Sequence, residues 1–410
     1  MKILYINPEA NFGGAERSLV DAIVSVGRLA PDVRMHVILL SEGPLNPYLR
    51  SLGLEVSVLR LPRTVAGLGD SAIKGTTRVF PFLLKNISAG VGAIRFGRLL
   101  RGAIRKIAPS VIHSNGIKSH ILLSLAGLPD RPVVWHLRDF VASRKLARGL
   151  LQRYSNRAVR GIAVSKAVAE DVQSFIKDLP TEVIYNGIDS DYFSPGAAQF
   201  EWLDQLAGFE PKLDGEIVRV GLVASFGKWK GQAVFLHAAS KVLQELSAKR
   251  VRFYVVGGAI YQTSGSQFSL EELKALTRKL GIAPSVGFVD FTPEICPVYR
   301  SLDIVVHAST EAEPFGRAIV EAMSCGIPVI ATRTGGASEI MDMSSGCLGV
   351  APNDIGQLSG AILRLVSDEK LRASMSDKGR SCVLENFSRA RLGSRLLEVY
   401  KRVSKDRSIS

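Results

Sequence analysis

The chain alternates short apolar runs with longer stretches in which apolar residues recur at helical spacing. The runs at 1–8, 35–40, 54–61, 110–115 and 132–139 are rich in Val, Ile and Leu, and they have the length of buried strands. Helical patterns separate them, which is typical of a parallel sheet covered by helices. The first half of the chain is therefore predicted to be one α/β module.

A second alternation of the same kind begins near residue 218, after a segment at 181–196 that ends on turn residues. The expected fold class is α/β, with two Rossmann-like domains that face each other across a cleft. We place the N-terminal domain at 1–187 and the C-terminal domain at 196–386. Residues 388–410 are predicted to form a helix that packs back on the first domain.

Length and composition agree with two folded domains, since the chain has 410 residues, 46% of them hydrophobic and 22% charged. The four cysteines form no C-x-x-C pair, so we expect buried thiols in a reducing compartment. The apolar run at the N-terminus is too short for a signal peptide, and no run is long enough to cross a bilayer. The expected location is the cytoplasm.

The net charge of +14 is concentrated between residues 60 and 160, where nineteen Arg and Lys stand against three acids. Residues 78–106 mix Phe, Leu and Ile with basic residues, and 141–160 has a similar character. We predict that both segments contact the anionic inner face of a membrane. A solvated face of the domain is the alternative, and the absence of a recognised module argues against nucleic acid.

Within 78–106, three arginines fall at helical spacing, and the apolar residues Leu99, Leu100 and Ile104 are expected on the other side of that helix. The arginines are Arg98, Arg101 and Arg105.

Two glutamates, Glu313 and Glu321, flank a predicted helix start in the segment EAEPFGRAIVEAMSCGIP (311–328). Gly316 interrupts the backbone, and a helix is expected from Arg317. The free N–H groups of a first helical turn bind anions, and a carboxylate on either side can hold ligand hydroxyls. This arrangement suits a nucleotide sugar. The alternative is a surface helix with two solvated acids.

A glycine-containing loop follows the first strand of each module. Gly13 and Gly14 precede a helix, where backbone N–H groups can approach a phosphate. In the second module, Lys228 and Lys230 lie in a loop suited to neutralising a diphosphate. An ordinary tight turn and a solvated basic turn are the respective alternatives.

The histidines divide into one candidate and two residues expected to be structural. His136 ends a strand of the first module, at the sheet edge that faces ligands in such folds, so it can hydrogen-bond a sugar hydroxyl. A structural role is the alternative for His136, and the neighbouring Arg138 and Asp139 are expected to pair. We expect His113 to be structural and His307 to be a packing residue.

Together these motifs resemble the retaining glycosyltransferases of family 4, which have the two-domain GT-B fold. The resemblance covers nearly the whole chain and rests on the GGAE loop, His136, NGID at 186–189, the K-W-K-G loop, EPFGRAIVEA and PVIATRTGG. It implies a hexosyltransferase that needs no metal ion or cofactor. The nucleotide-diphosphate sugar is expected mainly on the C-terminal domain, and the N-terminal domain is expected on the acceptor side. The acceptor is expected to be a saccharide or a polyprenyl- or lipid-linked molecule of cell-surface polysaccharide or glycolipid synthesis.

The resemblance also implies roles for individual residues. Glu313, His136 and Lys230 are the expected catalytic residues: Glu313 and His136 contact the donor sugar, and Lys230 neutralises the leaving phosphate. Glu321 is expected to hold the ribose. The remaining donor-binding residues, expected around the diphosphate, are Gly13, Gly14, Lys228, Phe315, Gly316, Arg317 and Ala318.

One position departs from the family pattern. Relatives usually carry Arg in V-A-R-x-x-x-W-K-G, where this chain has Ser225, and a serine supplies neither the charge nor the fork of a guanidinium. Lys228 is a candidate for compensation. A non-catalytic sugar-nucleotide-binding or scaffold protein therefore stays open as an alternative. A nucleotide-sugar epimerase or hydrolase of the same fold is a further one.

Overall fold

The computed structural model describes residues 1–62, 79–127, 131–211, 217–246, 251–259 and 265–405, with the side chains of 79–91 and 93 left out. The chain divides into two compact units, which we describe separately. Unit 1 comprises Met1–Gly187 and Arg389–Ser410, and unit 2 comprises Ile188–Ser388.

Unit 1 is built on a seven-stranded parallel sheet with the strand order β3-β2-β1-β4-β5-β6-β7. Its central strands are buried on both faces, which explains their nearly continuous apolar sequences. The strands are β1 (Lys2–Asn7), β2 (Arg34–Leu39), β3 (Glu55–Val58), β4 (Val111–Asn115), β5 (Val133–Leu137), β6 (Arg160–Ala163) and β7 (Thr181–Val183).

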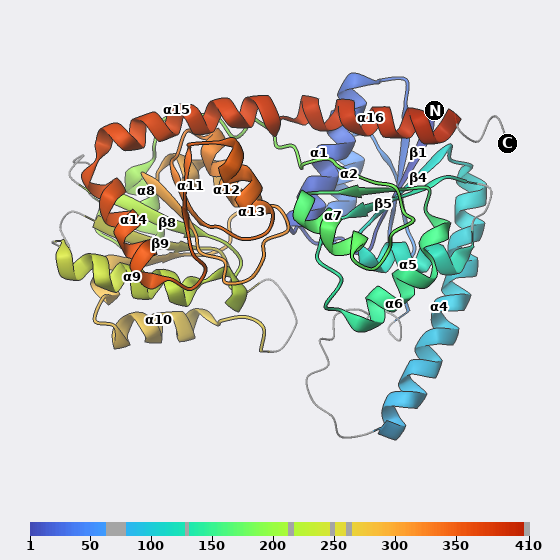
Figure 1. Cartoon of the computed structure of the whole chain (residues 1–410), viewed down its shortest axis with the longest axis horizontal. Coiled ribbons are helices and arrows are strands. Elements are labelled where there is room, and N and C mark those ends of the chain that lie inside the picture. The colour runs from blue at the N-terminus through green and yellow to red at the C-terminus, as the bar shows by residue number, and fades with distance from the viewer. Residues whose placement is uncertain (63–78, 128–130, 212–216, 247–250, 260–264, 406–410) are drawn as a thin grey trace. The chain divides into compact units, whose positions relative to one another are not determined.

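Helices cover both faces of this sheet (Figure 1). The C-terminal helix α16 (Arg389–Lys405) packs against α1 (Gly14–Leu29), and α4 (Val79–Ile107) packs against α5 (Ile117–Ala126). Leu396 and Tyr400 of α16 are fully buried and join the hydrophobic core of the unit. The other helices in the described part of unit 1 are α2 (Leu45–Ser51), α6 (Lys145–Arg153), the 3₁₀ turn η1 (Ser155–Arg157) and α7 (Lys166–Gln173).

The prediction that Leu99, Leu100 and Ile104 share one face of helix α4 is wrong for Leu99. Leu100 and Ile104 are 0% and 1% exposed, so their side of the helix packs into unit 1 rather than toward an outside partner. Leu99 is 63% exposed and shares the outer face with Arg95 and Arg98. Residue 78 lies outside the described residues.

Unit 2 contains a six-stranded parallel sheet with the order β10-β9-β8-β11-β12-β13. Its strands are β8 (Val218–Val223), β9 (Val251–Val256), β10 (Val286–Val289), β11 (Ile304–His307), β12 (Val329–Thr332) and β13 (Cys347–Val350). Among its described residues, the helices are α8 (Phe200–Leu206), η2 (Lys228–Lys230), α9 (Gln232–Glu245), α10 (Leu270–Lys279), η3 (Ala283–Ser285), α11 (Ile295–Arg300), α12 (Arg317–Ser324), α13 (Gly336–Met343), α14 (Ile355–Ser367) and α15 (Glu369–Asn386).

The two parallel sheets with their covering helices confirm the predicted α/β class with two Rossmann-like sheets. The four cysteines are buried and free, as expected. In the described part of the chain, no helix combines the length and apolar content that crossing a bilayer requires.

The strand orders locate the ligand-binding edge of each sheet. The connection order reverses between β1 and β4 in unit 1, and between β8 and β11 in unit 2. Ligands of open parallel sheets bind at such reversals, outside the carboxyl ends of the strands. The loops after these four strands are therefore where functional side chains are expected to gather.

Candidate active site

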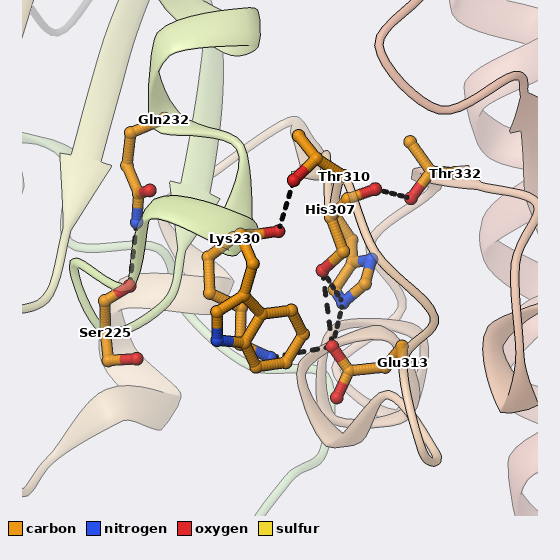
Figure 2. A network of polar contacts seen from close by, with 9 residues as sticks. Ser225, Lys230, Gln232, His307, Thr310, Glu313 and Thr332 are labelled. Carbon is orange, nitrogen blue, oxygen red and sulfur yellow. Dashed lines mark hydrogen bonds and ion pairs between the residues drawn. The ribbon is translucent and has the colours of Figure 1, made fainter. Parts of the chain in front are cut away.

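The site of unit 2 is formed by the loops that follow β8 and β11, at the reversal of the strand order. The first loop carries Lys230, and the second carries Glu313 (Figure 2). The loops touch at Gly231, where a Cβ atom would lie 1.8 Å from the Ala308 carbonyl oxygen and φ is +80°. Glycine is therefore required there. The Thr310 N–H donates to the Trp229 carbonyl at 2.7 Å and closes the contact between the loops.

Three side chains converge on one carboxylate oxygen of Glu313. Lys230 Nζ lies 2.7 Å, His307 Nε2 3.1 Å and Ser309 Oγ 3.2 Å from Oε2. Figure 2 shows the second carboxylate oxygen turned away from these partners. These three contacts fix the orientation of the carboxylate, and its second oxygen points away from Lys230, His307 and Ser309.

The Glu313 side chain stays ionised although the residue is only 8% exposed. Burial works against ionisation, but the charge of Lys230 and the hydrogen bond from His307 outweigh it and hold the pKa of Glu313 well below its ordinary value. The site thus contains a buried carboxylate that accepts hydrogen bonds at neutral pH.

The backbone of Glu313 is held by the glycine pair at the end of PVIATRTGG. The Gly336 N–H donates to the Glu313 carbonyl at 2.7 Å. A Cβ on Gly335, whose φ is +59°, would lie 2.4 Å from the same carbonyl oxygen. Larger residues at these positions would displace the loop that carries the glutamate.

Glu321 lies in α12, which begins at Arg317, and is 6% exposed. The Arg317 Nε and Nη2 each lie 3.0 Å from its Oε1, and the Tyr299 hydroxyl donates to its Oε2 at 3.1 Å. Gly316, the residue just before the helix, has a φ of +105°, a conformation that favours glycine. The predicted helix start is confirmed, and Glu321 is positioned by Arg317 and Tyr299.

The two lysines of the K-W-K-G loop have different surroundings. Lys230 is 17% exposed by side chain, and its Nζ lies 3.8 Å from the centre of the Trp229 ring. Lys228 is exposed, and its Nζ lies 5.6 Å from the centre of the Phe268 ring. The backbone carbonyl of Ser225 accepts a hydrogen bond from Gln232 Nε2–H at 2.7 Å (Figure 2).

In unit 1, the glycine loop ends at Gly14, the first residue of α1. The Gly13 N–H donates to Glu16 Oε2 at 3.2 Å, so a carboxylate from the same helix already occupies this N–H. Glu16 is 8% exposed, and burial raises its pKa.

His136 lies in β5 and is fully buried in unit 1. Its Nδ1 is 3.1 Å from His113 Nε2, and the Tyr400 hydroxyl is 2.7 Å from His113 Nδ1. Burial, reinforced by the charge of Arg138, lowers the pKa of both histidines well below the usual range. Among the described residues, His136 Nε2 has no hydrogen-bond partner. His136 is thus a neutral histidine, and its contact with a sugar stays a prediction.

The sequence interpretation missed two features of these sites. His307 was expected to be a packing residue, yet it contacts Glu313; its place at the end of β11, beside the reversal, was the available signal. Arg138 donates to Asn186 Oδ1 at 2.9 Å and also to Asn115, and Asp139 pairs with Arg144. A polar network around the half-buried Arg138 was not foreseen.

Two family models match the chain. The model of Glycosyl transferases group 1 matches residues 209–381, and the model of Glycosyltransferase Family 4 matches residues 45–192. These ranges contain most of the site residues of unit 2 and the strands β4 and β5 of unit 1. The chain belongs to glycosyltransferase family 4 and has the GT-B fold.

Curated relatives and solved structures agree with this assignment. A D-inositol 3-phosphate glycosyltransferase of Corynebacterium jeikeium is 32% identical over 197 residues, 48% of this chain and 45% of that protein. The chain thus spans about half the length of several such relatives, although one from Corynebacterium kroppenstedtii matches at 26% identity over 88% of this chain and 85% of its own. The structure of Anabaena HepE with UDP-glucose has a TM-score of 0.77 at 23% identity, covering 98% of this chain and 100% of that one.

Proposed function

We propose that this protein is a retaining, metal-independent hexosyltransferase that moves a sugar from a nucleotide diphosphate to a saccharide or lipid-linked acceptor in cell-surface polysaccharide or glycolipid synthesis. The observation that carries the proposal is the buried pair of Lys230 and Glu313, 2.7 Å apart at the strand-order reversal of unit 2. Membership of family 4 and the UDP-glucose bound to HepE support it.

In this proposal, each residue of the unit 2 site has one task. Glu313 accepts a hydrogen bond from a donor-sugar hydroxyl through the oxygen turned away from Lys230. Lys230 pairs with the negative charge that develops on the leaving diphosphate, which is the main electrostatic contribution to such a reaction. Glu321, oriented by Arg317 and Tyr299, accepts hydrogen bonds from the ribose hydroxyls.

The chemical step then needs no protein base. The acceptor oxygen bonds to the anomeric carbon on the face from which the diphosphate departs. The bond between that carbon and the phosphate oxygen breaks, and the same phosphate oxygen takes the acceptor proton. His136 and the start of α12, from Phe315 to Ala318, are proposed to contact the donor, as are Gly13, Gly14 and Lys228.

The donor and the stereochemistry can be tested together. We expect one of UDP-, GDP- or ADP-glucose to raise the melting temperature of the full chain, because ligand binding stabilises the folded state. With that donor and an acceptor, proton NMR should show an α-linked product from the α-linked donor. A β-linked product would refute retention, and loss of activity on exhaustive chelation, restored by Mg²⁺, would refute metal independence.

A non-catalytic sugar-nucleotide-binding protein is the second candidate. The observation that favours it is Ser225, which stands where relatives usually carry an arginine and offers its carbonyl to Gln232. A melting-temperature increase without turnover in the presence of acceptors would support this reading. Turnover of the donor without any acceptor would instead indicate an epimerase or hydrolase.

We also propose that unit 1 binds the anionic cytoplasmic face of a membrane through 78–106 and 141–160. On α4, the exposed apolar residues Ile94 (49%) and Leu99 (63%) lie among the exposed arginines Arg95 and Arg98. On α6, Leu146 is 62% exposed, and Lys145 and Arg148 of the same helix are exposed as well. Apolar side chains within a basic face suit the headgroup region of anionic lipid.

We expect the double variant Arg95→Glu, Arg98→Glu to lose binding to phosphatidylglycerol-containing vesicles at low salt, measured by co-sedimentation. Each basic residue near such a surface contributes about 1 kcal/mol, and the reversal also adds repulsion. Arg278→Glu with Lys279→Glu, at exposed positions of α10 in unit 2, is the control with the same change in charge. Equal losses in both double variants would show that only net charge matters and would contradict the proposal.

A further inference from the structure

Two of the four cysteines of unit 2 lie against each other. The Sγ atoms of Cys296 and Cys325 are 3.8 Å apart, and the two residues are only 1% and 3% exposed. Since a disulfide bond is about 2.05 Å long, the two sulfur atoms would have to approach by roughly 1.8 Å to be joined. A small movement of the side chains and of the helices that carry them therefore brings the pair to bonding distance.

The thiol pair lies beside Glu321, because the same two helices carry both. Cys296 and Tyr299 belong to α11, while Glu321 belongs to α12 and Cys325 ends it; these helices contact each other. The spacing of three residues in α11 and four in α12 places each cysteine on the same helix face as its neighbour. The Tyr299 hydroxyl donates to Glu321 Oε2 at 3.1 Å. The thiol pair and this hydrogen bond are thus adjacent contacts between the same helices.

The two thiols differ in their readiness to ionise. The hydrogen bond with Cys325, helped by the charge of Arg300, lowers the pKa of Cys296, although burial opposes this. The same hydrogen bond, together with burial, raises the pKa of Cys325. Because the thiolate is the reactive form of cysteine, Cys296 is the attacking thiol of the pair and Cys325 is the thiol that stays protonated.

We propose that Cys296 and Cys325 form a reversible oxidation site, in which a hydroperoxide converts the dithiol to a disulfide that joins α11 to α12. A small neutral oxidant of this class suits a buried pair. In a reducing compartment the dithiol is the resting state, and disulfides that form there are usually transient and redox-sensing.

The oxidation takes place in two steps with hydrogen peroxide as the oxidant. The Cys296 thiolate attacks one peroxide oxygen, so that an S–O bond forms, the O–O bond breaks and hydroxide leaves. Cys325 Sγ then attacks the Cys296 sulfur; the S–S bond forms, the S–O bond breaks, and the hydroxyl group leaves with the Cys325 proton as water. The two thiols lose two electrons and two protons in total, and the peroxide is reduced to two molecules of water.

The disulfide should weaken nucleotide-sugar binding, a consequence that rests on the proposed function of Glu321 as the ribose contact. Drawing the end of α12 toward α11 turns the Glu321 carboxylate away from the direction in which Arg317 and Tyr299 hold it. A lost hydrogen bond to a charged group weakens binding by roughly tenfold.

Peroxide treatment of the folded, fully reduced chain tests the oxidation site. After exposure to hydrogen peroxide, the chain is unfolded and its free thiols are alkylated with iodoacetamide. We expect peptide mass mapping to show a disulfide between Cys296 and Cys325 and alkylation of Cys347 and Cys382. Dithiothreitol should restore alkylation of all four cysteines. Free thiols at Cys296 and Cys325 after peroxide, or a disulfide that includes Cys347 or Cys382, would overturn the proposal.

Variants separate the roles of the two thiols. Cys325→Ser removes the second step, so dimedone should label the sulfenic acid of Cys296 after peroxide; Cys325→Ala serves the same purpose if the serine variant does not fold. Cys347→Ser is the matched control, since burial raises the pKa of Cys347 to about 12, and it should form the disulfide as the wild type does. A folded Cys325 variant without a dimedone adduct on Cys296 would contradict the assignment of the attacking thiol.

The melting-temperature shift with UDP-, GDP- and ADP-glucose, titrated on reduced and oxidised chains, tests the effect on binding. The nucleotide sugar that binds the reduced chain should bind the oxidised chain roughly tenfold more weakly, and dithiothreitol should reverse the change. Peroxide should not alter binding by Cys296→Ala. Equal affinity of reduced and oxidised wild type would overturn the link to Glu321. If none of the three nucleotide sugars binds either form, the proposed function and this link fail together, whereas the mass map still decides whether the disulfide forms.

Discussion

Glu313→Gln should lower the rate of sugar transfer by on the order of 10³-fold, with little change in the fold. Glutamine has nearly the same shape, but its neutral amide accepts a hydrogen bond less strongly than the carboxylate does. It also removes the negative charge that Lys230 Nζ contacts at 2.7 Å. Because the second oxygen of Glu313 is the proposed contact with the donor sugar, the loss should appear mainly in kcat.

The measurement that tests this prediction is the initial rate of acceptor-dependent nucleotide release. Glu311→Gln is the matched control, since it makes the same chemical change two residues away at an exposed position. Circular dichroism and the melting temperature verify that both variants are folded. Wild-type turnover by Glu313→Gln would refute the central role of this residue.

Lys230→Met should also reduce transfer by on the order of 10²–10³-fold, because the leaving diphosphate would lose the counter-charge that we propose for it. The variant should also be less stable at neutral pH, by roughly 3 kcal/mol, since Glu313 is left buried without its cation. Lys241→Met, on the exposed face of α9, is the control. Rates and urea unfolding curves measure the two effects.

The pH dependence of this variant distinguishes charge from packing. In the wild type, the lowered pKa of Glu313 contributes stability that is fully present above the unfolded value of about 4.5 and is lost as the pH falls below it. Without Lys230, burial dominates and the pKa of Glu313 should rise. The stability difference between wild type and variant should therefore shrink as the pH is lowered from 7 to 4. A difference independent of pH would indicate lost packing instead.

Much of the architecture was readable from local patterns. The strands at 1–8 and 110–115 are apolar because both faces of the central sheet are buried, and this gives a strong signal. The amphipathic C-terminal segment was also predicted as a helix, and α16 buries Leu396 and Tyr400. Helix α4 was harder, because Leu99 and Leu100 are adjacent and the sequence does not say which of them faces the domain.

By itself, the sequence determined the α/β class and identified Glu313, Glu321 and Lys230 as candidate site residues, because strand periodicity and loop motifs are properties of short segments. Only the tertiary structure decided which groups meet. Lys230 and Glu313 are 83 residues apart in the chain and reach 2.7 Å because β8 and β11 are neighbours at the reversal of the sheet. The contact of His307 with Glu313 has the same cause: strand order brings loop ends together, and no local pattern records strand order.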